Sequence, residues 1–265
     1  LCAHKGINHI SFTGSVTTGR LVQASAANNI VPVTLELGGK SPQLFFEDAN
    51  LESALPFLVN AGIQNGGQTC SASSRILVHR SRYNEVVDHM SQKYKDLIVR
   101  PAINDGALGP LISERQKSIV EDFISKGQRL NLVAQGEIDS SAPTKGHYVA
   151  PHLFADVPED HILAKDEIFG PVQVIMPFDT EEEAISIANG TDYGLVASIW
   201  TNDGARQMRL AKKLKSGQVF INNYGAGGGV ELPFGGRGFS GHGREKGFEA
   251  LYGFSTLKTV ASYHQ

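Results

Sequence analysis

The sequence IVPVTLELGGK occupies residues 30–40, and the organisation of the chain is predicted from this segment. Its β-branched and apolar residues predict a strand, and the two glycines end it. Earlier in the chain, residues 7–13 alternate apolar and polar side chains as a second strand would, and residues 20–28 are compatible with a helix. Strand, helix and strand make one βαβ unit, whose two strands run parallel. Because ligands lie outside the carboxyl ends of such strands, Glu36 is expected at the ligand-binding edge.

A glycine-rich turn from Gly14 to Gly19 connects the first strand to the helix. This geometry presents the free N–H groups of a helix N-terminus to a phosphate. The spacing also mimics a P-loop, but Arg20 and Leu21 stand where that motif has its Lys and its Ser or Thr. The local residues leave two alternatives open, an anion-binding turn and a plain structural turn. In both, Gly14 and Glu36 belong at the same sheet edge.

The rest of the chain continues to alternate strands with helices, which predicts an α/β fold. Strands are expected at residues 41–46, 75–79, 198–201, 218–222 and 253–260, and within 167–179 after a turn. Helices are expected from residue 51 onward, with Asp48 or Asn50 as its cap, and at residues 83–97, 114–126, 180–189 and 205–215. Residues 133–155 carry turn signals and are expected to form a surface β excursion.

Composition excludes several classes of protein. The 265 residues are 41% apolar and 19% charged with a net charge of −3, which is typical of an ordinary globular protein and gives no reason to expect nucleic acid or a membrane as partner. No apolar run approaches the roughly 20 residues that a membrane-spanning helix needs, and no leader pattern is expected. Two cysteines fit a reducing, cytoplasmic compartment. The nine histidines lack metal-ligand spacing, so no metal site is expected.

Cys70 follows a glycine-rich turn and precedes a Ser/Ala-rich segment, which would place it at the start of a helix. Such a position lowers the pKa of a thiol and offers backbone N–H groups to an oxyanion. The alternative is a buried structural cysteine. Cys2 has no comparable flank and is interpreted as incidental. Residues 225–229 resemble a dinucleotide fingerprint, but no helix pattern follows them, so a loop over a cleft is the favoured interpretation.

Six ordered motifs carry a family resemblance. They are FTGS at 12–15, LELGGK at 35–40, GQTC at 67–70 with Arg75, EIFGP at 167–171, LPFGG at 232–236 and SGHGRE at 240–245. Together they resemble the catalytic, C-terminal half of the NAD(P)-dependent aldehyde dehydrogenase superfamily. The resemblance implies an open, twisted, mostly parallel sheet flanked by helices, with a remnant of a Rossmann-like cofactor domain. It implies three parts: the last βαβ unit of the dinucleotide-binding domain (1–38), the catalytic α/β domain (39–245) and a C-terminal oligomerisation strand and tail (246–265).

By this resemblance, Cys70 is the nucleophile and Glu36 the general base. The thiolate attacks an aldehyde to give a thiohemiacetal, hydride transfer to NAD or NADP gives a thioester, and Glu36 activates the water that releases the carboxylic acid. The chemistry suits the residue types, because sulfur is a good nucleophile and leaving group and a partly apolar pocket raises the pKa of a carboxylate.

The resemblance also implies residues that hold cofactor and substrate. The cofactor set is Gly14, Ser15 and Gly19 under the pyrophosphate, Leu37 beside the carboxamide, Gln116 and Glu167 at the ribose, and Phe169 against the nicotinamide. Phe234 and Tyr224 are expected to line the tunnel for a small aldehyde, with residues 224–231 as a loop over its mouth. The strand expected at 253–260 implies a homo-oligomer, a dimer or tetramer.

Family members are much longer than this chain, and the part not represented would precede residue 1. The chain therefore matches a fragment, in which cofactor binding and NAD-dependent activity are expected to be weak or absent. Two alternatives follow. One is a cofactor-independent thiol esterase that uses the same cysteine and glutamate, and the other is an inert module that oligomerises through its terminal strand.

Overall fold

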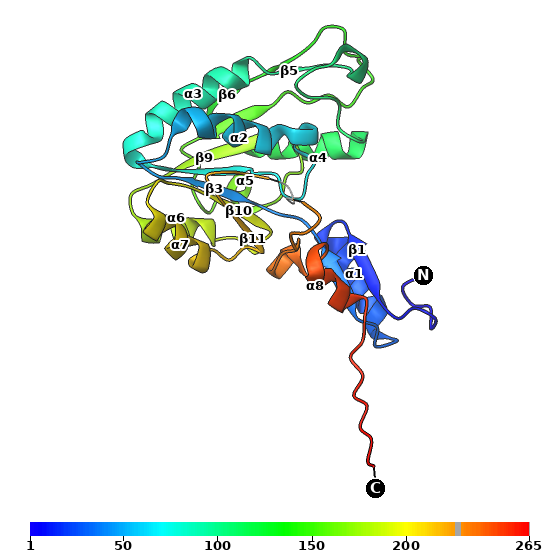
Figure 1. Ribbon diagram of the computed structural model, residues 1–265. Helices are drawn as coiled ribbons and strands as arrows, with labels where there is room; N and C mark the ends of the chain where they lie inside the picture. The colour runs from blue at the N-terminus through cyan, green and yellow to red at the C-terminus, as the bar shows by residue number, and fades with distance from the viewer. Residues whose placement is uncertain (226–228, 265) are drawn as a thin grey trace.

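A seven-stranded sheet organises the computed structural model, which describes residues 1–225 and 229–264. Its strand order is β11-β10-β3-β4-β9-β8-β6 (Figure 1). The strands are β3 (Pro42–Phe45), β4 (Arg75–His79), β6 (Asn131–Gln135), β8 (His152–Ala155), β9 (Val172–Phe178), β10 (Val196–Trp200) and β11 (Gln218–Ile221). All neighbouring pairs are parallel except β6 with β8. The expected α/β fold with a mostly parallel sheet is confirmed.

Helices lie on both faces of this sheet, with α2 and α3 on one side and α6 and α7 on the other (Figure 1). Their bounds are α2 (Leu51–Ile63), α3 (Tyr83–Lys95), α4 (Glu114–Lys126), α5 (Ile162–Lys165), α6 (Glu181–Ala188) and α7 (Gly204–Lys213). Five of them begin at a polar side chain that accepts a hydrogen bond from a backbone N–H of the first turn: Asn50, Ser113, His161, Thr180 and Asp203. Such caps satisfy N–H groups that have no partner within the helix.

Alternation along the strands divides the apolar core into two layers. Leu44, Leu77 and Val174 pack in the layer beneath α4 to α7. Their neighbours Phe45 and Ile76 pack in the layer beneath α2 and α3. Both layers are almost completely buried, and each fully buried large apolar side chain contributes about 1.5–3 kcal/mol. A one-residue slip in register would reverse both layers, which fixes the strand pairing.

A small side lobe contains the βαβ unit. It consists of β1 (Ile10–Thr13), α1 (Val16–Ala27) and β2 (Val33–Glu36), and β12 (Gly241–His242) pairs antiparallel to β2. The β1 and β2 strands are parallel with Thr13 opposite Glu36, and the N–H of Gly14 donates to the carbonyl of Glu36 at 3.0 Å. The expectation that Gly14 and Glu36 share a sheet edge is therefore confirmed. The β12 contact was not predicted, because two residues carry no strand signal.

One expectation about strands was wrong in part and another was wrong. Residues 137–147 lie at the surface as expected, but the same segment ends in β8, which is buried between β6 and β9. Only β5 (Ile98–Val99) and β7 (Glu137–Ile138) form a separate small ladder there. Residues 253–260 are not a strand in this chain: α8 (Gly247–Gly253) is followed by residues without regular structure through 264. A strand needs a neighbouring backbone to pair with, and this tail extends away from the body (Figure 1).

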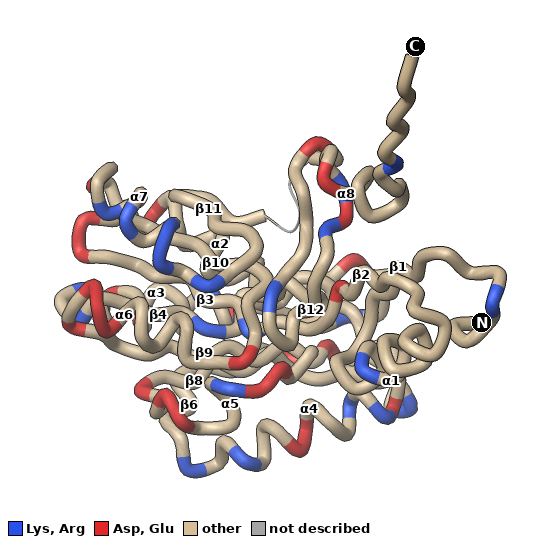
Figure 2. Tube along the Cα trace, turned by 90° about the horizontal axis from the view of Figure 1, so that it is seen from below, with Lys and Arg blue, Asp and Glu red and all other residues tan. Residues whose placement is uncertain are grey.

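Charged residues are mixed over the trace. Blue and red segments alternate in Figure 2 without a large region of one sign, as the small net charge suggests. Within residues 1–225 and 229–264, every helix is too short or too polar to cross a bilayer.

Candidate active site

One cavity of about 500 Å³ brings together most of the residues singled out from the sequence. It is lined by Thr13, Gly14, Ser15, Glu36, Leu37, Gly38, Cys70, Gln116, Ile119, Glu167, Ile168 and Phe169. It lies at the carboxyl ends of β1 and β2, where the side lobe meets the segments that lead into β4 and β9. The strands of the main sheet therefore face the cavity with their amino ends, whereas β1 and β2 of the side lobe face it with their carboxyl ends.

Gly19 is the one expected cofactor residue that does not line this cavity. It is buried in α1 beneath Leu37, and a Cβ at Gly19 would lie 2.6 Å from Cδ2 of that side chain. Its absent side chain lets α1 pack closely against the residue that follows β2. Gly14 and Ser15 do line the cavity, and the hydroxyl of Ser15 caps α1 by accepting from the N–H of Thr18 at 3.2 Å.

Cys70 lies in a turn rather than at the start of a helix, contrary to the expectation. After α2 ends, residues 64–67 form one short 3₁₀ turn, and the chain then continues directly into β4. Gly67 has a φ of +72°, and a Cβ there would overlap the carbonyl oxygen of Gly170. Glycine is therefore needed at this position, both for the left-handed backbone and for the close approach of two loops.

The pKa of the Cys70 thiol is raised, not lowered as its expected helix position implied. Burial is the main cause, and the negative charges of Glu167 and Glu36 act in the same direction. The backbone N–H groups of Ser71 and of Cys70 itself favour the thiolate, but their effect is smaller in sum. Loss of either carboxylate charge would therefore make the thiolate easier to form.

Glu36 is a buried carboxyl without compensation. Its side chain is 2% exposed, and neither oxygen has a hydrogen-bond partner among the described residues. Burial, and then the charge of Glu245, raise its pKa to about 8, while Arg244 opposes the shift. A carboxyl that titrates near neutral pH is suited to proton transfer. Glu245 and Arg244 follow β12, and no sequence pattern indicates that they act on Glu36.

Glu167 reaches into the cavity from the turn before β9. Its Oε1 accepts a hydrogen bond from the N–H of Gly39 at 3.0 Å. A Cβ at Gly38 would overlap the same carboxylate, so the glycine pair lets Glu167 approach the backbone after β2. Burial raises its pKa, and the Gly39 N–H and the charge of Lys40 act against that shift. The free face of the carboxylate is available to a hydroxyl donor.

Phe234 and Tyr224 pack on the far side of Cys70. They belong to one apolar cluster with Ala61, Leu195 and the cysteine. The Tyr224 hydroxyl donates a hydrogen bond to the carbonyl of Ser71 and so fixes the cysteine turn. Of the loop expected at 224–231, residues 226–228 lie outside the described residues.

An adjoining groove of about 530 Å³ was not anticipated from the sequence. It is lined in part by Ala61 and Tyr224, which also contact the apolar cluster around Cys70. The amides of Asn60, Gln64 and Asn65 line it as well. These residues lie at the end of α2 and in the turn after it. Their sequence is explained by the helix and its end, so it contains no pattern that predicts a binding site.

The cavity fits a phosphorylated ligand that carries hydroxyl groups. The first turn of α1 offers N–H groups to an anion beside Gly14 and Ser15. Glu167 can accept hydrogen bonds from vicinal hydroxyls, and the ring of Phe169, 36% exposed, offers an apolar face. Within the described part of the chain, no group of three His, Cys, Asp or Glu side chains could hold a metal ion.

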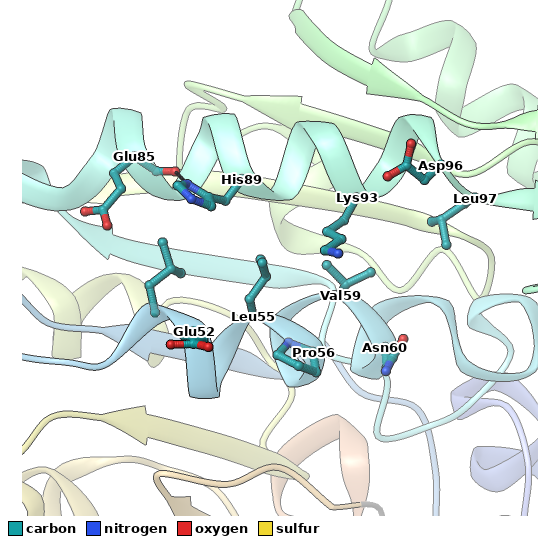
Figure 3. Close-up of a pocket in the computed structure, with 11 residues that line it drawn as sticks. Glu52, Leu55, Pro56, Val59, Asn60, Glu85, His89, Lys93, Asp96 and Leu97 are labelled. Carbon is teal, nitrogen blue, oxygen red and sulfur yellow. Dashed lines mark hydrogen bonds between the residues drawn. The ribbon is translucent and has the colours of Figure 1, made fainter.

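A larger groove of about 760 Å³ lies between α2 and α3, away from these residues. Figure 3 shows Lys93 reaching between the two helices toward Val59, with Leu55 also between them. The other charged side chains that line the groove are Glu52, Glu85 and Asp96. No Cys, Ser or Thr is among the residues that line it. Its one histidine, His89, is bonded through Nδ1 to the carbonyl of Glu85 at 2.8 Å, so this groove does not compete as a catalytic site.

Comparison with known proteins gives one consistent family. The sequence model of the aldehyde dehydrogenase family matches residues 1–260. Betaine aldehyde dehydrogenase of Rhizobium leguminosarum bv. trifolii is 38% identical over 263 residues, which cover 98% of this chain and 54% of that protein. The chain spans about half the length of the curated relatives it matches.

Solved structures agree. A Burkholderia cenocepacia protein described as an aldehyde dehydrogenase superposes with a TM-score of 0.97 at 60% identity, over 98% of this chain and 55% of its own. The NAD+ complex of an aldehyde dehydrogenase from Bacillus cereus gives a TM-score of 0.92 at 40% identity, over 98% and 52%.

Proposed function

Because the chain belongs to the aldehyde dehydrogenase family, we propose that it carries the acyl-transfer core of an enzyme that oxidises an aldehyde to a carboxylic acid with NAD or NADP. The observation that carries this proposal is the convergence of Cys70, Glu36 and Glu167 on one cavity that also receives the N-terminus of α1. A thiol, a carboxyl that titrates near neutral pH, and a hydroxyl acceptor are the groups this chemistry requires.

The first step belongs to Cys70. Its thiolate attacks the carbonyl carbon, a C–S bond forms, and the π electrons move to oxygen, which gives the anion of a thiohemiacetal. Because burial and two carboxylates raise the pKa of this thiol, the thiolate is formed when a neighbouring base takes the proton. Glu36 lines the same cavity, and its raised pKa of about 8 suits it to that role.

The residues present fit the nicotinamide end of a dinucleotide. Gly14 and Ser15 would hold a phosphate at the α1 N-terminus, Glu167 the ribose hydroxyls, and Phe169 the ring. When bound, the dinucleotide supplies the hydride acceptor that converts the thiohemiacetal into a thioester. The chain's own residues orient it and exclude water from Cys70.

Glu36 carries the final step. Its carboxylate takes a proton from water, the resulting hydroxide adds to the thioester carbon, and the C–S bond breaks to release the acid and the Cys70 thiolate. A pKa of about 8 allows the carboxyl to accept a proton and return it near neutral pH. Deep burial without partners leaves both oxygens free to orient a water molecule.

A second candidate function is hydrolysis of activated esters without cofactor. It needs only Cys70 and Glu36, which line the same cavity. The two functions are compatible, since an ester enters the same pathway at the thioester. We further propose a reducing, cytoplasmic location and assembly into a homo-oligomer, whose interface would order residues 254–264.

The test combines two assays on the same chain. NADH formation from an aldehyde and NAD+ is followed at its absorbance, and 4-nitrophenyl acetate hydrolysis is measured without cofactor. Cys70→Ala should abolish both activities, whereas Cys2→Ala, the matched control at the other cysteine, should leave them unchanged. Equal ester turnover in the native chain and Cys70→Ala would contradict the proposed nucleophile.

A further inference from the structure

We propose that the first turn of α4 is a brace that holds the Cys70 loop and the Glu167–Phe169 turn in register, with Gln116 and Gln68 as its positioning residues. The effect on the reaction rests on the proposed function, but the brace itself rests on contacts within the chain. Neither glutamine is a reacting group. Each acts by fixing the backbone beside a group that is.

Gln116 fixes the turn that carries Glu167. Its Nε2 donates to the carbonyl of Ile168 at 3.1 Å and to that of Phe169 at 3.0 Å. Phe169 has a φ of +54°, a left-handed conformation that is unfavourable for a bulky residue and persists only where its surroundings enforce it. Both N–H groups of the Gln116 amide are thereby used, so only its oxygen remains, and a ligand group that meets it must be a donor.

Gln68 fixes the other loop, two residues before Cys70. Its Oε1 accepts from the N–H of Ile112 at 2.9 Å, just ahead of α4. Its Nε2 donates to the carbonyl of Asn65 at 2.9 Å, and the Asn65 amide returns a bond to the Gln68 carbonyl at 3.1 Å. Gln68 therefore connects the segment before α4 to the left-handed turn at Asn65, which leads to Cys70.

The segment between these two contacts, from residue 111 into α4, is itself held in place by hydrogen bonds and packing. Ser113 caps α4 by accepting from the N–H of Gln116 at 3.2 Å, which sets the position of the glutamine. Leu111 is buried, and its N–H donates to the carbonyl of His147 at 2.8 Å. Gly170, at the end of the cofactor turn, lies so close to Val120 of α4 that a Cβ would overlap it.

This arrangement separates two effects. Loss of the Gln116 donors releases the Glu167–Phe169 turn while the cysteine loop keeps its bonds to Ile112 and Asn65. Loss of the Gln68 amide releases the cysteine loop while the cofactor turn keeps its bonds. If α4 had only a general structural role, either substitution would accelerate hydrogen exchange in both loops. If the two glutamines act separately, each substitution accelerates exchange only in its own loop.

The test uses Gln116→Met and Gln68→Met, because methionine keeps the length and flexibility of glutamine without its amide. Ser118→Ala, at an exposed position of the same helix, is the control. Three quantities are measured on each chain: hydrogen exchange of backbone amides at 167–170 and 68–72, the dissociation constant for NADH, and the rate of Cys70 alkylation by iodoacetamide.

In Gln116→Met we expect exchange at 167–170 to accelerate about tenfold and the dissociation constant for NADH to rise by a similar factor, since two hydrogen bonds are lost. Exchange at 68–72 and alkylation of Cys70 should stay within about twofold. Gln68→Met should show the reverse, with faster exchange at 68–72 and an altered alkylation rate. Ser118→Ala should match the native chain in all three.

Unchanged exchange at 167–170 in Gln116→Met would overturn the brace, and so would equal acceleration of both loops by either variant. If the native chain binds no NADH, the proposed cofactor function is contradicted for this chain, but the exchange measurement still decides the brace. Failure of the function and failure of the brace are therefore distinguished.

Discussion

The backbone N–H of Gly39 donates a 3.0 Å hydrogen bond to Oε1 of Glu167, which lies 128 positions further along the chain. This bond joins the segment that follows Glu36 to the turn that precedes β9. It also brings the Glu167 carboxylate near Cys70, where its charge raises the pKa of the thiol. The ease of forming the Cys70 thiolate therefore depends on the charge of a residue from a distant segment.

Removal of the Glu167 charge should therefore make Cys70 more acidic. The rate of alkylation of the native chain is expected to keep rising above pH 9.0, because the pKa of Cys70 lies above its ordinary value of 9.0. Glu167→Gln should shift the midpoint of this profile to lower pH. Glu159→Gln, in an exposed loop, serves as the charge-matched control. Identical midpoints for Glu167→Gln and the native chain would show that burial alone controls the thiol.

Glu36 should make the folded state less stable as pH rises. Its pKa is about 8 in the folded state against an ordinary 4.5, so between these values the folded chain holds a proton that the unfolded chain has lost. Stability contributed by this proton is complete below pH 4.5 and lost as pH rises through 8. Glu36→Gln should thus be more stable than the native chain at pH 9, by on the order of 3 kcal/mol, with little difference below pH 4.5.

Urea unfolding of both chains from pH 4 to pH 9 would measure this difference. Glu159→Gln again provides a control without the buried site. A constant difference across the range would mean that the pKa of Glu36 is the same in the folded and the unfolded chain. The same substitution should abolish ester hydrolysis, which separates its catalytic cost from its gain in stability.

Lys40 should act in the opposite direction. Its amine is 2% exposed, and its Nζ has no hydrogen-bond partner among the described residues. Burial, and then the charge of Arg75, lower its pKa from 10.5 to about 7, although Glu167 and Asp166 favour the charged form. Between pH 7 and 10.5 the unfolded chain binds the extra proton, so stability rises with pH through this window.

Lys40→Met should remove this slope. We expect the variant to be more stable than the native chain at pH 7 and below, by on the order of 3 kcal/mol, and the gain to shrink toward pH 10.5. Chemical unfolding at pH 6, 8 and 10 provides the measurement. Lys126→Met removes an exposed lysine of α4 that pairs with Asp122 and should show no comparable slope. A pH-independent gain in Lys40→Met would contradict titration of the buried amine.

Sequence patterns predicted the parts of the fold that depend on local chemistry. The βαβ unit and the cap at Ser113 carry periodicity and capping signals within a few residues, and both are present. The β8 strand was assigned to the surface because the turn-rich residues before it dominated the pattern, whereas its burial depends on β6 and β9. The tail after α8 shows the converse, since its alternation predicts a strand for which the chain provides no partner.

The sequence predicts which residues line the cavity better than it predicts their pKa values. The sequence motifs predict that Gly14, Glu36, Cys70 and Glu167 share one site, and in the structure all four line the same cavity. The direction of the Cys70 pKa shift could not be read from the sequence, because it depends on burial and on carboxylates from distant segments. Likewise, the role of Gln116 toward the Phe169 turn becomes visible only when two carbonyls 52 and 53 positions away converge on its amide.

Arg75 should be the costliest polar side chain to remove from the main sheet. Its buried guanidinium donates to the carbonyl of Lys40 at 2.9 Å and to those of Ile187 and Ala188 at 2.8 Å each. It thereby satisfies the carboxyl end of α6 and the backbone beside Glu36 at once. Arg75→Met would remove the guanidinium donor from the carbonyls of Lys40 and Ala188, while the Ile187 carbonyl would keep the N–H of Gly190 at 3.1 Å. We expect the variant to lose about 3 kcal/mol or more of unfolding free energy.

The matched control for Arg75 is Arg80→Met. Arg80 pairs with Asp179 at 2.6 Å, but both side chains are more than half exposed, and such surface pairs contribute only about 0–1 kcal/mol. Urea midpoints of the two variants should therefore differ widely. Arg75→Lys should recover only part of the loss, since one amine cannot reach three carbonyls in the geometry of the guanidinium fork. A loss in Arg75→Met no larger than that in Arg80→Met would show that water replaces the missing donors at the end of α6.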